Sequence, residues 1–305
     1  MKLSRRGFLR VAAITGSAAV GATASRARAA DLDHAGENES AMLVDATVCA
    51  GCRACEAACS EANALPAPQA DVDVTKERRD TGPEAFTGVT GAEGPDGQPR
   101  YAKRQCMHCL SPACASACPV RALDKQPEGP VIYRGDRCMG CRYCMVACPF
   151  EIPKYQYDKV APLVRKCTFC AQRQKEGKKP ACAEACPTGA LTFGKRGALI
   201  ELAKHRIYRT PDKYVHHVYG EHEAGGTNWL YISDVPFEKL AMRSVRDEAY
   251  PDKVQGALGA PPFVMTLWPP LLMGLYAFSK RRDAHAAEKP AAPAETAEEK
   301  GDRNV

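Results

Sequence analysis

Residues 138–149 read CMGCRYCMVACP, which places four cysteines within eleven residues and a proline directly after the last of them. Thiolates are ligands for soft metal centres, so the spacing should indicate which centre the segment holds. The chain has 305 residues and 16 cysteines. They form four tetrads with no cysteine left over: Cys49, Cys52, Cys55 and Cys59; Cys106, Cys109, Cys114 and Cys118; Cys138, Cys141, Cys144 and Cys148; Cys167, Cys170, Cys182 and Cys186.

Disulfides and zinc are the alternatives to an iron-sulfur centre. Cysteines two and three residues apart within one loop rarely reach disulfide geometry, and the chain is far longer than the small scaffolds that depend on such bonds. Structural zinc sites usually pair two C-x2-C knuckles. The first and third tetrads instead follow the C-x2-C-x2-C-x3-C run of bacterial ferredoxins, and the third adds the trailing proline. The spacing therefore favours 4Fe-4S clusters.

Sixteen thiolates at four per cluster predict four clusters. In two-cluster ferredoxins the fourth cysteine of a run binds the other cluster, so we expect the middle tetrads to exchange Cys118 and Cys148. By elimination the outer tetrads exchange Cys59 and Cys186. The four expected ligand sets are set 1, Cys49, Cys52, Cys55 and Cys186; set 2, Cys167, Cys170, Cys182 and Cys59; set 3, Cys106, Cys109, Cys114 and Cys148; and set 4, Cys138, Cys141, Cys144 and Cys118.

Short segments of strand character precede the tetrads, at residues 41–45, 100–104, 131–134 and 163–166. Pro119, Pro149 and Pro187 follow the last cysteine of three tetrads. Proline suits the first turn of a helix, so we expect a unit of strand, ligand loop and short helix to recur. Ser60 replaces proline after the first tetrad, which weakens the predicted helix start there. A further strand is predicted in the run GTNWLYISDVPFEKL.

The net charge of +6 comes from the first 29 residues, which hold six cations and no acid. The remainder is neutral, which argues against a nucleic-acid-binding protein. Between Arg100 and Pro180, however, 16 lysines and arginines face 6 acids. We expect this excess to offset the negative charge of the clusters. His108 lies inside the second tetrad and has two interpretations, a hydrogen-bond donor to a cluster sulfur or a structural histidine.

The two ends of the chain suggest export and membrane attachment. Residues 1–29 combine the adjacent Arg5 and Arg6, an apolar stretch and an A-x-A site, which resembles a twin-arginine signal peptide, although an amphipathic surface helix is the alternative. Residues 254–279 carry no charge and precede three basic residues. They predict a transmembrane anchor with its C-terminus in the cytoplasm, against the alternative of a buried core helix. The cysteine domain would then lie on the periplasmic side of the bacterial inner membrane.

The tetrads resemble the four-cluster ferredoxin-like electron-transfer subunits of membrane-bound respiratory oxidoreductases. The segments YAKRQCMHCLSPACASACPVRAL, CRYCMVACPFEIPKY and HHVYGEHEAGGTNWLYISDVPFE are most similar to the iron-sulfur subunit of hydrogenase-2-type nickel-iron hydrogenases. The resemblance implies an α+β fold of two tandem bacterial-ferredoxin-like modules and the same crossed ligation. It also implies partners, namely the small and large hydrogenase subunits and an integral-membrane quinone-reactive subunit.

The expected organisation is a signal peptide at 1–29, a double ferredoxin-like domain at 30–206, a cysteine-free extension at 207–253, the anchor at 254–279 and a disordered cytoplasmic tail at 280–305. Within the domain, module A joins 41–60 to 160–195 and closes around module B at 100–158, with a loop insertion at 61–99. No catalytic constellation and no small-molecule substrate site are predicted. Alternatives are the beta subunit of a molybdenum or tungsten formate dehydrogenase or related reductase, and a zinc-stabilised scaffold.

Overall fold

The computed structural model describes residues 36–69, 72–76 and 79–288. The chain divides into two compact units, residues 1–251 and 252–305, and each is described by itself. The predicted signal peptide lies outside the described residues, as does the end of the tail from residue 289. All sixteen cysteines belong to the first unit and are described.

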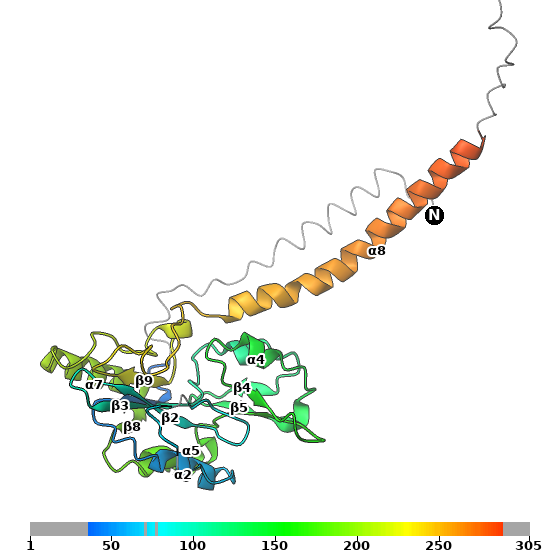
Figure 1. Cartoon of the computed structure of the whole chain (residues 1–305). Helices are drawn as coiled ribbons and strands as arrows, with labels where there is room; N and C mark the ends of the chain where they lie inside the picture. The colour runs from blue at the N-terminus through cyan, green and yellow to red at the C-terminus, as the bar shows by residue number, and fades with distance from the viewer. Residues whose placement is uncertain (1–35, 70–71, 77–78, 289–305) are drawn as a thin grey trace, which may run out of the picture. The chain divides into compact units, whose positions relative to one another are not determined.

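A three-stranded sheet forms one half of the first unit. Its central strand β1 (Ser40–Asp45) pairs antiparallel with β8 (Leu191–Lys195) and parallel with β9 (Trp229–Ile232). Five of the six residues of β1 are buried, as expected of an apolar strand that is covered on both faces. Helix α7 (Arg196–Arg209) packs against all three strands (Figure 1). The sheet thus joins the start of the chain to its end beyond the fourth tetrad.

The predicted strands before the tetrads are confirmed. The first is β1, and the others are β3 (Pro99–Arg104), β5 (Val131–Tyr133) and β7 (Val164–Arg165). The predicted strand in the cysteine-free extension is also confirmed as β9. Strands β3, β5 and β7 each form a two-stranded antiparallel ladder, with β2 (Gly88–Glu93), β4 (Leu123–Lys125) and β6 (Lys154–Tyr155) respectively. Strand β2 lies within the segment expected to be a loop insertion.

The expected helices after the trailing prolines are wrong. Short helices lie inside the tetrads instead: α2 (Ala54–Ala62), α3 (Ala113–Ser116), α4 (Tyr143–Ala147), α5 (Ala171–Lys175) and α6 (Ala181–Glu184). Turns follow each Cys-Pro pair. Proline disfavours helical geometry at the residue before it. Cys148, which precedes Pro149, is accordingly extended, with φ −80° and ψ 115°. Because Ser60 imposes no such restriction, α2 continues through Cys59 and is the longest of the five.

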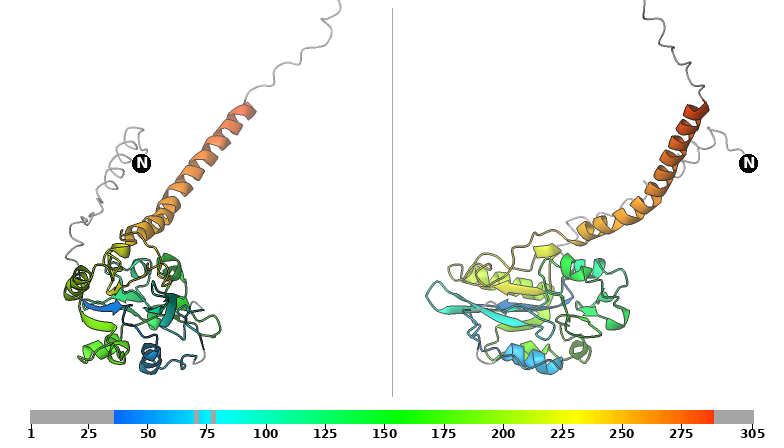
Figure 2. Two further views of the ribbon diagram at one scale, coloured as in Figure 1. Left: turned by 60° about the vertical axis from the view of Figure 1, so that its left-hand side comes forward. Right: turned by 45° about the vertical axis from the view of Figure 1, so that its right-hand side comes forward.

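Two views show how the ladders divide the first unit. Strands β4 and β5 lie beside α4 on one side, while β1, β8, β9 and α7 lie together on the other, and α2 and α5 lie below the sheet (Figures 1 and 2). Two 3-10 turns, Gly135–Arg137 and Glu223–Gly225, complete the connections. The helices of the first and last tetrads pack together, α2 against α6, and those of the middle tetrads do likewise, α3 against α4.

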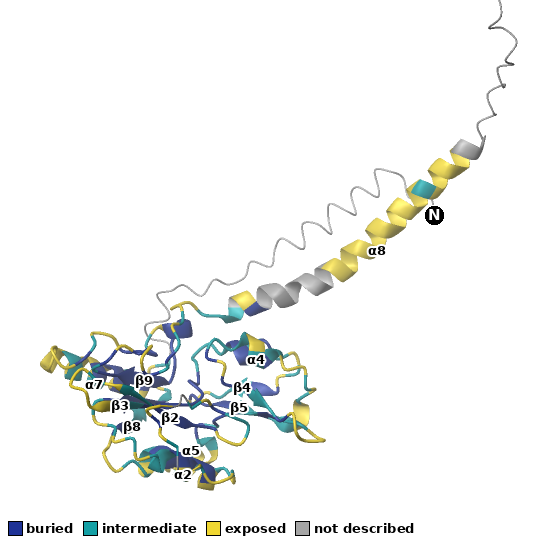
Figure 3. Cartoon of the chain, viewed as in Figure 1, coloured by how far each residue is buried: buried dark blue, intermediate teal, exposed yellow. Residues whose placement is uncertain are grey.

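The largest buried cluster mixes aromatic side chains with cysteines. Trp229, Tyr231 and Phe169 are each at most 1% exposed, and Cys106 and Cys167 belong to the same cluster. The Tyr231 hydroxyl accepts from Gln105 Nε2 at 2.6 Å and donates to the Lys103 carbonyl at 2.9 Å. Buried residues concentrate along β1, β9 and these loops (Figure 3). The core thus extends from the sheet directly into the tetrads.

The predicted transmembrane anchor is wrong. Helix α8 (Pro251–Glu288) contains the charge-free run, but no helix among the described residues combines the length and apolarity needed to cross a bilayer. Trp268, two prolines, Gly274 and Tyr276 interrupt the leucines and methionines, and Lys280 ends the run. The fold-class and localisation predictions are corrected on this point, whereas the ferredoxin-like α+β domain stands.

A buried carboxylate in α2 provides a test of this packing. Glu56 is 2% exposed and accepts from the Val89 amide at 2.6 Å, from Arg79 at 2.6 Å and from Arg53 at 3.0 Å. Replacing Glu56 by Ala leaves these donors without their acceptor, so we expect the free energy of unfolding to fall by about 3–5 kcal/mol. Anaerobic denaturant unfolding measures it. The exposed Glu176→Ala variant is the control and should match the parent, and an equal loss in both variants would contradict the account.

Candidate functional site

Set 1 lies at a small cavity beneath the first tetrad. Cys49, Cys52 and Cys55 line it together with Cys186 of the last tetrad. The negative charge of Cys186 also helps to raise the pKa of the Cys49 thiol, after the larger effect of burial. The structure therefore brings together the four residues that the sequence placed in this set, although Cys186 is 127 residues beyond Cys59.

Set 4 lies at a second small cavity between the middle tetrads. Its lining includes Cys138, Cys141 and Cys144 of the third tetrad and Cys118 of the second. Burial raises the pKa of Cys144 to about 12, and the next contribution comes from Cys118. Here too the structure brings the fourth cysteine of one tetrad to the first three of another.

Sets 2 and 3 are each brought together around buried thiols. Burial and then the charge of Cys148 raise the pKa of Cys109, with further contributions from Cys106 and Cys114. All four belong to set 3. In set 2, burial raises the pKa of Cys59 to about 11, with smaller contributions from the charges of Cys182 and Cys170. The charge of Lys103 opposes this rise. After burial, the charge of Cys59 in turn helps to raise the pKa of Cys167.

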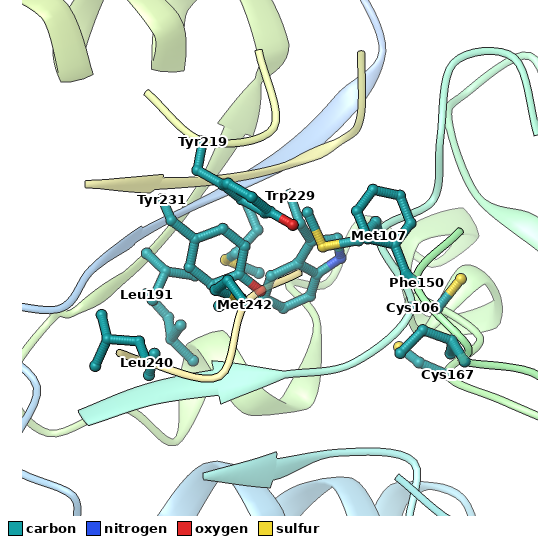
Figure 4. Close-up of a cluster of buried hydrophobic side chains, with 14 of the residues drawn as sticks. Cys106, Met107, Phe150, Cys167, Leu191, Tyr219, Trp229, Tyr231, Leu240 and Met242 are labelled. Carbon is teal, nitrogen blue, oxygen red and sulfur yellow. The ribbon is translucent and has the colours of Figure 1, made fainter. Parts of the chain in front are cut away.

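The four sets lie in a row. Cys55 of set 1 is close enough to Cys182 of set 2 for its pKa to be raised by that thiolate. Cys167 of set 2 interacts in the same way with Cys106 of set 3, and these two side chains lie next to each other in Figure 4. Cys144 of set 4 acts on Cys114 of set 3. The order is therefore set 1, set 2, set 3, set 4.

Solvent reaches the two ends of this row. Two of the sixteen cysteines are exposed, Cys52 and Cys141, while the others are buried or intermediate. Cys52 belongs to set 1 and Cys141 to set 4. The cysteines of the inner sets are buried or intermediate, and the terminal sets each present one cysteine to the surface.

The ligand loops have an unusual backbone. In each tetrad, one non-glycine residue beside the second cysteine has a positive φ, from 47° to 60°: Arg53 and Arg142 follow the second cysteine, and His108 and Phe169 precede it. This left-handed turn directs amides at sulfur: Phe169 N donates to Cys167 Sγ at 3.3 Å and Gly140 N to Cys138 Sγ at 3.4 Å. Amide donors around sulfur are the arrangement that tunes iron-sulfur clusters.

Without a metal these buried thiols would stay protonated, and a bound metal would remove their protons. Burial is the first cause of every raised cysteine pKa in the site, and it raises that of Cys55 to about 12 and that of Cys148 to about 11. A bound metal cation deprotonates a coordinating thiol outright. Within the described residues, no three His, Cys, Asp or Glu side chains converge as they would on a single metal ion. The cavities, the sulfur donors and the amides suit 4Fe-4S clusters, which these cysteines would hold and which would accept and release single electrons.

Three buried lysines surround the sets and were not singled out by the sequence. Lys103 and Lys166 are 2% and 4% exposed, and Lys125 is partly buried. Burial lowers the pKa of Lys125, whereas for Lys103 the thiolates together outweigh burial and the pKa is raised. Only the surplus of basic residues between Arg100 and Pro180 pointed to them.

His108 lies between sets 2 and 3. Its ring stacks on Phe169, with centroids 4.9 Å apart, and its Nδ1 accepts from the Val131 amide at 2.9 Å. The ring is wholly buried, and burial followed by Lys166, Lys125 and Lys103 keeps its pKa well below the usual value. His108 is therefore neutral, and the proton resides on Nε2, which has no hydrogen-bond partner among the described residues.

Comparison with known proteins agrees with this geometry. Residues 98–196 match the family described as a 4Fe-4S dicluster domain. A protein of Nitratidesulfovibrio vulgaris is 48% identical over 298 residues, covering 95% of this chain and 80% of its own length. The "Hydrogenase-2 operon protein HybA" of Escherichia coli O157:H7 is 37% identical, covering 80% of this chain and 85% of its own length. The "Formate dehydrogenase, nitrate-inducible, iron-sulfur subunit" of E. coli K12 is 36% identical, with coverage of 64% and 68%.

The fold and the cysteine sets define a ferredoxin-like protein whose cofactors are 4Fe-4S clusters. Within that class, the chain belongs to the iron-sulfur subunit family that includes HybA and the formate dehydrogenase iron-sulfur subunits.

The loop backbone around set 1 can be tested with a single methyl group. Gly51 has φ +65°, and a Cβ there would lie 2.7 Å from the Tyr101 ring. Replacing Gly51 by Ala should therefore displace the loop that carries Cys49 and Cys52 and lower the iron content of the purified protein. Gly97→Ala is the matched control, because Gly97 has φ +74° and nothing within 4 Å of its Cβ position. Unchanged iron in the Gly51 variant would show that the loop tolerates the contact.

Proposed function

We propose that this chain is a non-catalytic electron-transfer subunit that holds four 4Fe-4S clusters in sets 1 to 4. Electrons would pass along the row between a nickel-iron hydrogenase catalytic pair and a quinone-reactive membrane subunit. The chain itself would contribute ligands, spacing and electrostatics, and the catalytic chemistry would belong to its partners.

The observation that carries the proposal is the row of four ligand sets with one exposed cysteine at each end. Each pair of adjacent sets has cysteines close enough to influence one another, namely Cys55 with Cys182, Cys167 with Cys106, and Cys114 with Cys144. A store of metal has no need for contact between neighbouring sites, whereas electron transfer does. The exposed ligands Cys52 and Cys141 would lie at the points where electrons enter and leave.

The hydrogenase assignment rests on the relatives. HybA aligns over 80% of this chain, including most of the cysteine-free extension, whereas the formate dehydrogenase subunit aligns over 64%. We therefore propose the small and large subunits of a hydrogenase as one partner and an integral-membrane quinone-reactive subunit as the other. The second candidate is the same role in a molybdenum or tungsten formate dehydrogenase.

Metal analysis of the native complex distinguishes these candidates. With four clusters, the chain should contribute about sixteen irons to the complex beyond those that its partners hold, and a contribution of about eight would contradict the count. Nickel in the complex would support the hydrogenase, whereas molybdenum or tungsten without nickel would reject it in favour of the formate dehydrogenase. Zinc without iron would reject both.

The crossed ligand sets make a separate prediction. Replacing Cys148 by Ala should alter the same reduced-state EPR signal as replacing Cys114 by Ala, because both residues belong to set 3. Cys144→Ala is the control within the same tetrad as Cys148, and it should alter a different signal, that of set 4. If Cys148→Ala and Cys144→Ala affect one common signal, each tetrad holds its own cluster and the crossing is wrong.

A further inference from the structure

Lys103 occupies an unusual position on β3. Its side chain is 2% exposed and lines the cavity of set 1 together with Cys49, Cys55 and Cys186. Strand β3 ends at Arg104, immediately before the second tetrad, so Lys103 is held by the ladder with β2 rather than by a mobile loop. An ammonium group is thereby fixed beside the cysteines of the terminal set.

No carboxylate among the described residues pairs with this ammonium group. Its Nζ donates to the neutral Gln105 Oε1 at 2.9 Å and lies 4.5 Å from the centroid of the Trp229 ring. Removing an ammonium ion from water is costly unless an opposite charge compensates for it. A neutral amide and an aromatic face do not supply a full negative charge, so the compensating charge must come from elsewhere in the site.

The cysteines supply that charge from two different sets. Lys103 lines the cavity of set 1, and the Trp229 ring that its ammonium group faces packs against Phe169, which lies between Cys167 and Cys170 of set 2. After the larger effect of burial, its charge also favours the thiolates of Cys55, Cys59, Cys167 and Cys170. A 4Fe-4S cluster with four thiolates carries a negative charge that grows by one unit when it accepts an electron. The ammonium group therefore interacts more strongly with the reduced state than with the oxidised state.

We infer that Lys103 is a buried cation shared by sets 1 and 2, and that its charge raises the reduction potentials of these two clusters above what they would be without it. This inference rests on the ligand sets of the proposed function. Lys103 touches no reacting atom, so it is a positioning residue that acts through the clusters.

Lys125 provides a matched comparison within the same chain. It is the last residue of β4, and its Nζ donates to Glu39 Oε2 at 2.6 Å and to the Cys109 carbonyl at 3.1 Å. Its charge acts on Cys109 of set 3. It is a partly buried lysine next to a cysteine set, but one with a carboxylate partner and with influence on a different set.

The test is an EPR-monitored redox titration of the native complex with Lys103→Met, Lys103→Arg and Lys125→Met. In Lys103→Met, two of the four transitions should move to lower potential, with the reduced-to-oxidised ratio at a fixed potential falling about tenfold, which is 59 mV for one electron. Lys103→Arg keeps the charge and should leave all four close to the parent. Lys125→Met should shift a transition other than those two.

Three results would overturn the inference: no shift in Lys103→Met, a shift of all four transitions, or a shift of the same transition in Lys103→Met and Lys125→Met. If the Lys103→Met protein fails to accumulate, the Lys103→Arg variant provides the test. Normal cluster loading in Lys103→Arg would support a requirement for the positive charge, whereas equal failure would show a requirement for the shape of the lysine side chain and overturn the inference. The outcome is separate from that of the proposed function, which fails if fewer than four transitions of the parent complex respond to substitutions among the sixteen cysteines of this chain.

Discussion

The crossing of cysteines between tetrads is the constraint on which the rest of the structure depends. Cys186 lies with Cys49 and Cys52, and Cys118 lies with Cys138 and Cys144, so each cavity is closed by residues from distant parts of the chain. The central sheet serves the same end, because β1 before the first tetrad pairs with β8 after the last. Such long-range closure fixes the order of the four sets as well as their composition.

Charge is the second organising factor. Sixteen thiols in a largely buried site would not ionise together without compensation, and burial raises the pKa wherever a shift is found for them. The chain compensates with lysines placed inside the fold: Lys103 beside sets 1 and 2, and Lys125 and Lys166 beside set 3. After the larger effect of burial, the three also help to keep the pKa of His108 low and its ring neutral. The interior is therefore built for negative charge that the metal clusters would bring.

The grouping of the cysteines could be predicted because cysteine spacing is a local property with a specific geometric meaning. The strands before the tetrads were equally accessible, since segments such as VIYR are short, β-branched and bounded by turns. Strand β2 was not, because GVTGAE has weak strand character and forms only where β3 pairs with it. The trailing prolines were misleading, since in the three tetrads that have one, proline ends a helix as readily as it begins another. The role of Lys103 depends on tertiary burial, and no sequence pattern marks it.

The apolar run before Lys280 looked long enough for an anchor, but its prolines, glycine and aromatic residues reduce its apolarity below what a span requires.

The central claim is that the fourth cysteine of each tetrad binds the cluster of another tetrad. An experimental structure of the anaerobically purified complex, with iron located by anomalous scattering, tests it most directly. The account predicts four separate iron centres in one row, with Cys148 bound to the centre that Cys106, Cys109 and Cys114 hold. An iron centre bound by Cys148 together with Cys138, Cys141 and Cys144 would contradict it.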